Sequence, residues 1–132
     1  MTNLTTASIT ELERLLEERA IQLWREVEEY RDGASGKHEA AAAATERDQA
    51  DLAFVAAAAT IDRIQLQRDI EELRDIEAAQ ARIRNGVYGE CIDCGESVGY
   101  QRLQAWPTAE RCRDCQHDHE RRPRGRTRSL SI

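Results

Sequence analysis

The sequence predicts a mostly α-helical protein, in which a long antiparallel coiled-coil hairpin precedes a small cysteine-bearing module with a C-terminal helix. Three observations predict this class. The 132 residues include only two Trp, three Tyr and one Phe but 19 Ala, and 33% are charged, against ~25% in ordinary domains. Apolar residues recur at helical spacing over most of the chain. All four cysteines fall in two Cys-x-x-Cys pairs. Because alanine buries little area, long paired helices suit this composition better than one thick core.

The first helix is expected to begin near Ser8-Ile9-Thr10-Glu11, which resembles a capping box. Asp32-Gly33-Ala34-Ser35-Gly36 is expected to interrupt it, because two glycines within four positions weaken helix propagation. Helix is expected to resume near His38 and continue through the alanines that follow. Apolar residues at steps of three and four form one stripe along the first arm: Ile9, Leu12, Leu16, Ala20, Leu23, Val27 and Tyr30.

A second long helix is expected from Leu52 to Arg84, a span of about 50 Å at about 1.5 Å per residue. Asn85-Gly86 is a C-cap pair that should end it. Two such helices joined by a short polar link usually fold back on each other. We therefore expect a coiled-coil hairpin over residues 1–85 with an acidic tip near 45–53. The second expected helix carries its own apolar stripe, formed by Leu66, Ile70, Leu73, Ile76 and Ile83.

The strongest chemical signal is a pair of Cys-x-x-Cys turns separated by 17 residues. Two such turns can place four thiolates at the corners of a tetrahedron, which is the arrangement that Zn²⁺ accepts. We expect one structural zinc ion in a C4 zinc-ribbon-like module over residues 86–120. A redox dithiol, disulfides and a catalytic zinc are weaker alternatives, since no β-α-β pattern is present and four sulfur ligands leave no position for water. The expected ligands are Cys91, Cys94, Cys112 and Cys115.

Other residues of the module have structural interpretations. Val98 and Tyr100 suggest a short strand between the cysteine pairs. His117 and His119 are expected on a solvated terminal helix rather than at the metal. Three apolar residues are expected to pack beneath the zinc site: Leu103, Trp106 and Pro107.

The charge distribution limits the partners. Residues 1–120 carry 14 Lys or Arg against 25 Asp or Glu, a net −11, and residues 121–132 add five Arg, giving −6 overall. An acidic body repels a phosphate backbone, so sequence-specific DNA binding is not expected. The Arg-rich segment 121–132 is expected to be a disordered tail. No apolar run is long enough for a membrane span, so a cytoplasmic protein without membrane contact is expected.

Three segments of the module resemble the DksA/TraR C4-type zinc-finger family: residues 86–95 (GVYGECIDCG), 102–107 (RLQAWP) and 112–116 (CRDCQ). Residues 48–53 (DQADLA) also fit the Asp-x-x-Asp-x-Ala motif at the coiled-coil tip of DksA-like factors. The resemblance covers about residues 8–120 in architecture and residues 48–116 in motif detail.

This resemblance implies a bacterial transcription regulator that binds RNA polymerase. Family members insert the coiled-coil tip through the secondary channel of the polymerase and modulate initiation without binding promoter DNA. The tip residues would be Asp48, Asp51 and Ala53, and Arg68 occupies the position of a polymerase-docking arginine. Capping of the second helix by Asp48 and Asp51 is the simpler alternative.

The sequence departs from the family where the best-known members bind guanosine tetraphosphate. The matching positions are Asp75, Trp106 and Gln116, none of which is cationic. A multiply charged anion would lose its charge-assisted hydrogen bonds there. Alarmone binding is therefore expected to be weak or absent.

Two other classes of function stay open. The first is a zinc-stabilised coiled-coil adaptor with a partner other than polymerase. The second is direct DNA binding through the arginine tail, which would be strongly salt-dependent. An enzyme is not expected, because the sequence shows no nucleophile–base pair and no phosphate-cradling glycine loop.

Overall fold

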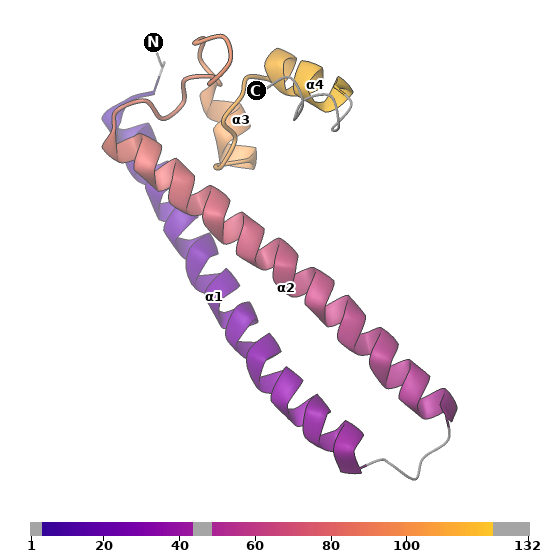
Figure 1. Cartoon of the computed structure of the whole chain (residues 1–132). Helices are drawn as coiled ribbons and strands as arrows, with labels where there is room; N and C mark the ends of the chain where they lie inside the picture. The colour runs from indigo at the N-terminus through magenta and orange to yellow at the C-terminus, as the bar shows by residue number, and fades with distance from the viewer. Residues whose placement is uncertain (1–3, 44–48, 123–132) are drawn as a thin grey trace. The chain divides into compact units, whose positions relative to one another are not determined.

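The computed structural model describes the backbone of residues 4–43 and 49–122, and the side chains of residues 4–33 and 50–122. Two long helices, α1 (Thr6–Ala43) and α2 (Gln49–Arg84), are followed by the short helices α3 (Tyr100–Ala105) and α4 (Arg113–Arg121) (Figure 1). This confirms the predicted class, a helical hairpin with a cysteine module and a C-terminal helix. None of the described helices is long and apolar enough to span a bilayer.

Helix α1 begins at Thr6, two residues before the predicted capping box. The Ser8 amide donates to Thr5 Oγ1 at 3.0 Å, and the Ile9 amide donates to the Thr5 carbonyl at 3.0 Å. Thr5 therefore caps the helix, and the prediction that Ser8 does so was wrong. A threonine at this position serves the same purpose, because its hydroxyl accepts from an amide of the first turn.

The expected interruption at residues 32–36 is also wrong, since α1 continues without a break to Ala43. A glycine inside a helix costs about 1 kcal/mol relative to alanine, which weakens a helix without ending it. The alanines at 40–43 have the highest helix propensity and extend the same helix.

Helix α2 begins at Gln49, three residues earlier than predicted, and this places Asp51 in its first turn. Its end agrees with the prediction. Gly86 has φ of +74°, which favours glycine. The Gly86 amide donates to the Ile83 carbonyl at 3.1 Å, and the Val87 amide donates to the Arg82 carbonyl at 3.0 Å. These two bonds form a Schellman motif, which turns the chain out of the helix toward the cysteines.

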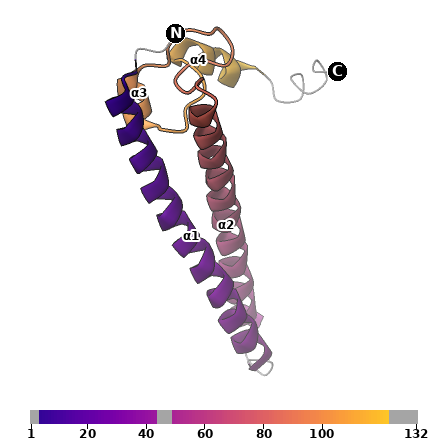
Figure 2. The ribbon, with the colours of Figure 1, turned by 90° about the vertical axis from the view of Figure 1, so that its left-hand side faces the viewer.

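The described residues divide into two compact units. One lies within residues 17–75 and the other within residues 1–16 and 76–132. In the first, here called the helix pair, α1 and α2 run side by side in opposite directions (Figures 1 and 2). Leu23 is fully buried there, and Arg19 Nε donates to Glu72 Oε2 on the other helix at 2.6 Å.

The second unit, here called the zinc unit, combines the start of α1 and the end of α2 with the cysteine module. Its buried apolar residues come from all of these parts: Leu12, Leu16, Ile76, Ala79, Tyr88, Cys91, Val98, Leu103 and Ala109. Every position of the two predicted stripes is buried or half-buried. Burial of the stripes is what holds the long helices against their neighbours.

Candidate metal centre

The four cysteine sulfur atoms form one cluster. All four lie within 4.8 Å of one another, and Cys94 Sγ and Cys112 Sγ are 3.7 Å apart. A tetrahedral zinc site with Zn–S bonds of about 2.3 Å has sulfur–sulfur edges of about 3.8 Å. The donors and their spacing therefore fit one structural Zn²⁺, as predicted from the sequence.

The first cysteine pair lies on a tight turn. The Gly95 amide donates to the Cys91 carbonyl at 3.0 Å, and Gly95 has φ of +76°. The Cys91 amide in turn donates to the Glu96 carbonyl at 2.8 Å. These bonds curl the backbone around Cys91, which is buried, whereas Cys94 is exposed.

The second cysteine pair lies at the start of α4. Cys112 is the N-cap residue, and its Sγ accepts from the Cys115 amide at 3.5 Å. The positive end of the helix therefore faces a sulfur ligand.

The thiols differ in their tendency to ionise. Burial opposes ionisation of Cys91, but backbone hydrogen bonds, the largest from Cys112, outweigh it and lower its thiol pKa to about 6. The pKa of Cys115 is raised, first by its hydrogen bond with Cys112 and then by burial. Four thiolates packed this closely repel one another, so a divalent cation is needed before all four can ionise.

An arginine joins the two cysteine turns. Arg111 Nε donates to Asp93 Oδ2 at 2.8 Å, and Arg111 Nη1 donates to Glu110 Oε1 at 3.0 Å. The Ile92 amide also donates to the Glu110 carbonyl at 2.9 Å. Sequence reasoning missed this link, although an acid inside the first pair and an arginine directly before the second pair were visible.

Two expectations for the module were wrong. Val98 and Tyr100 do not form a strand; in residues 86–122 the only strand-like pairing is an isolated bridge between Glu90 and Ser97, and Tyr100 begins α3. Trp106 is 42% exposed rather than packed beneath the metal, whereas Leu103 is fully buried as predicted.

Other expectations agree with the structure. His117 and His119 are exposed on α4. Pro107 is half-buried, and its carbonyl accepts from the buried Tyr88 hydroxyl at 2.7 Å. Burial raises the pKa of Tyr88 to about 12.

The predicted tip and docking residues lie in the helix pair. Asp51 and Ala53 are exposed near the start of α2, and Arg68 is exposed farther along the same helix. Asp48 lies outside the described residues. The predicted arginine tail, residues 121–132, also lies outside them except for Arg121, the last residue of α4, and Arg122.

The family model "Prokaryotic dksA/traR C4-type zinc finger" matches residues 86–121, the segment that carries all four clustered thiols. The cysteine module therefore belongs to the DksA/TraR C4-type zinc fingers. The chain is also similar beyond the finger to a solved structure titled transcription factor DksA2 from Pseudomonas aeruginosa. That match has a TM-score of 0.75 and 27% identity, and it covers 90% of this chain and 88% of the other.

Two curated DksA/TraR relatives are named RNA polymerase-binding transcription factor DksA. The Caulobacter vibrioides protein is 38% identical over 80 residues, which is 58% of this chain and 56% of the relative. The Haemophilus influenzae protein is 40% identical over 48 residues, 36% of this chain and 33% of the relative. The matched sequence thus spans about half or less of these relatives.

Proposed function

We propose that this chain is a DksA-like transcription regulator that binds bacterial RNA polymerase and inserts the tip of its helix pair through the secondary channel to modulate initiation. The observation that supports this most is similarity to the DksA2 structure over 90% of the chain, together with the printed name of the curated relatives. Such a role is one of binding rather than catalysis, and it places the chain in the bacterial cytoplasm.

The proposed tip residues are Asp48, Asp51 and Ala53. Asp51 lies in the first turn of α2, where a carboxylate is favoured by the helix dipole, and its side chain is exposed. A solvated carboxylate near a helix end can reach the metal-bearing centre of a polymerase without taking part in the reaction. Capping of α2 and contact with a partner are compatible roles for the same residue.

Arg68 is the proposed docking residue. It is exposed on α2, seventeen residues beyond Asp51, which is about 25 Å along the helix axis. A guanidinium at this position can pair with an acidic side chain on the outer surface of a partner whose channel holds the tip.

Direct binding of guanosine tetraphosphate is proposed to be weak. Gln116 is uncharged, and its Nε2 donates to Glu120 Oε1 at 2.9 Å. Trp106 supplies an aromatic face in place of a cation. A tetraphosphate would meet fewer charge-assisted bonds at these positions than in members with basic residues there.

The deciding experiment measures capture of purified bacterial RNA polymerase by the zinc-loaded chain, and transcription from a sensitive promoter. Asp51→Asn should abolish the effect on transcription while capture persists. Asp32→Asn is the matched control, because Asp32 is an exposed aspartate on α1 of the same helix pair. Equal transcription effects of the two variants would contradict the role of the tip.

The docking role of Arg68 is tested separately, by comparing polymerase capture by two arginine variants of α2. Arg68→Ala should weaken capture, whereas Arg63→Ala should not, because Arg63 is exposed on α2 but about 140° away around the helix. If the folded, zinc-loaded chain captures no polymerase, the adaptor with another partner becomes the better interpretation.

A further inference from the structure

The zinc unit contains an open pocket beside α3, and none of its described lining residues is a cysteine. Its volume is about 790 Å³, large enough for a few side chains. The residues that define it come from the turn before α3, from α3 and its end, and from the start of α4: Val98, Tyr100, Arg102, Ala105, Trp106 and Arg113.

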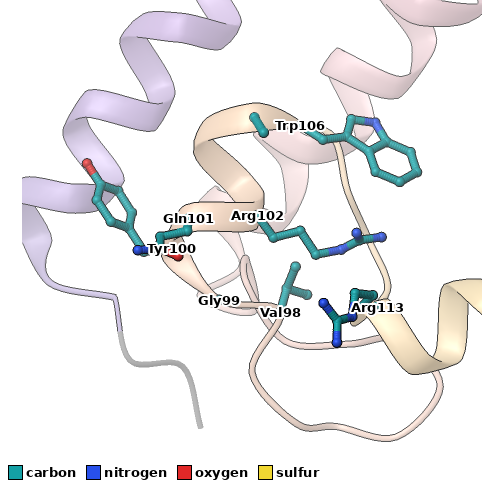
Figure 3. Close-up of a pocket in the computed structure, with 8 residues that line it drawn as sticks. Val98, Gly99, Tyr100, Gln101, Arg102, Trp106 and Arg113 are labelled. Atoms are coloured by element: carbon teal, nitrogen blue, oxygen red, sulfur yellow. The ribbon is translucent and has the colours of Figure 1, made fainter.

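The pocket is positively charged within an acidic protein. Arg102 and Arg113 line it, and none of its described lining residues is Asp or Glu. The whole chain carries a net charge of −6. In Figure 3 the side chains of Arg102, Arg113 and Trp106 lie on one side of the pocket, whereas the Tyr100 side chain extends to the other. The cationic groups are therefore gathered at one place.

Arg102 is held in position by the surrounding structure. Its Nε donates to the Arg111 carbonyl at 3.1 Å, and its guanidinium carbon lies 5.1 Å from the centroid of the Trp106 ring. Its Nη2 is covered yet has no hydrogen-bond partner. The hydrogen bond to Arg111 and the ring contact therefore fix the positive charge of Arg102 beside Trp106 in the pocket lining.

The lining favours one class of ligand. The exposed guanidinium of Arg113 can match the two oxygens of a carboxylate. Next to it, Val98, Ala105 and the partly exposed Trp106 ring offer an apolar surface. A carboxylate with an apolar neighbour, as in a peptide that carries Glu between aliphatic residues, satisfies both parts of the pocket. A phosphate group would use the arginines and leave the apolar surface unused.

We propose that this pocket binds an acidic peptide segment of a partner protein, with a carboxylate paired to Arg113 near the charge of Arg102 and an adjacent apolar side chain against Trp106. The site is separate from the proposed tip and docking residues, and it does not require that the partner be polymerase.

The test uses the full-length, zinc-loaded chain labelled with ¹⁵N. It is titrated with the capped peptide Gly-Leu-Glu-Leu-Gly and with its counterpart Gly-Leu-Gln-Leu-Gly, and the Trp106 indole N–H resonance is followed. The Glu peptide should bind about tenfold more tightly than the Gln peptide, because a charge-assisted hydrogen bond is lost. Arg113→Gln should weaken binding of the Glu peptide by a similar factor.

Arg84→Gln is the matched control, since Arg84 is an exposed arginine of the same unit that does not line the pocket. It should leave binding unchanged. Equal affinity for the two peptides, equal effects of the two variants, or no saturable shift with either peptide would overturn the proposal. Displacement of the Glu peptide by inorganic phosphate at a lower concentration than the peptide itself would identify a phosphate site and also overturn it.

Discussion

Among the described residues of the helix pair, Asp69 is a buried charged residue with one oxygen that lacks a hydrogen-bond partner, and replacing it with asparagine should stabilise the pair. Asp69 is only 3% exposed. Its Oδ1 accepts from Gln65 Nε2 at 3.0 Å, whereas its buried Oδ2 has no donor. Arg19, Glu26 and Tyr30 of α1 all interact with Asp69. The Glu26 carboxyl can donate a hydrogen bond only when it is protonated. Burial and the neighbouring Asp69 charge raise the pKa of Glu26.

The magnitude follows from these contacts. A buried polar atom without a partner costs about 1–3 kcal/mol. In Asp69→Asn the new amide can donate to the Glu26 carboxylate, while the retained oxygen still accepts from Gln65. The lost attraction between Asp69 and Arg19 offsets part of this gain. The net stabilisation at pH 7 should be about 1–2 kcal/mol, which lowers the local opening equilibrium about 5–30-fold.

The pH dependence has a definite sign. Because the folded-state pKa of Glu26 is raised above 4.5, its contribution to stability is fully present below about pH 4.5. It is lost as the pH rises through the raised value. At acid pH the protonated Glu26 can supply the donor that Asp69 lacks. The advantage of Asp69→Asn should therefore shrink at acid pH.

Amide hydrogen exchange of residues 62–73 measures this effect, with amides of the zinc unit as an internal reference. Asp51→Asn is the control, because Asp51 is an exposed aspartate of the same helix. Faster exchange in Asp69→Asn at pH 7, or a stabilisation that grows toward acid pH, would refute the reasoning.

Two further predictions concern the zinc unit. Arg111→Met removes the link to Asp93 and should weaken zinc affinity about 10–100-fold, the range for groups outside the ligand set that orient the ligands. Competition with a chromogenic chelator measures the affinity, and an unchanged affinity would contradict the role of Arg111. Tyr88 should ionise only near pH 12, because burial of its hydroxyl disfavours the phenolate; its neutral form therefore contributes stability below about pH 10 that is lost as the pH rises toward 12. The phenolate absorbance that Tyr88→Phe removes should appear near pH 12, and its appearance near pH 10 would contradict this.

Local signals in the sequence were sufficient for the metal site and for the ends of some elements. The spacing of the cysteines predicts a cluster because each Cys-x-x-Cys turn constrains two sulfurs by local geometry alone. Gly86 likewise ends α2 because the left-handed conformation of a C-cap is a property of one residue. The stripe from Ile9 to Tyr30 could be predicted because helical periodicity depends only on spacing.

The errors arose where neighbouring structure outweighs a local preference. Gly33 lowers helix propensity, yet α1 continues because the residues on both sides favour helix. Val98 and Tyr100 have strand-forming side chains, but Tyr100 begins a helix whose Leu103 is buried in the zinc unit. Burial of Asp69 could not be predicted, because its cost depends on which groups face it from the other helix.

The two units differ in how they are stabilised, and this bears on where a partner would act. Among the described residues, Leu23 is the only buried apolar side chain of the helix pair, whereas the zinc unit has nine and a metal site. Large apolar side chains on α2 are exposed instead, including Phe54 at 76% and Ile61 at 67%. Since local stability follows buried apolar contact, the helix pair should open at lower free energy than the zinc unit. A partner that binds the part of α2 within the helix pair would then order that unit, which carries Asp51, and leave the zinc unit unchanged. Slower amide exchange confined to residues 17–75 would identify such a partner.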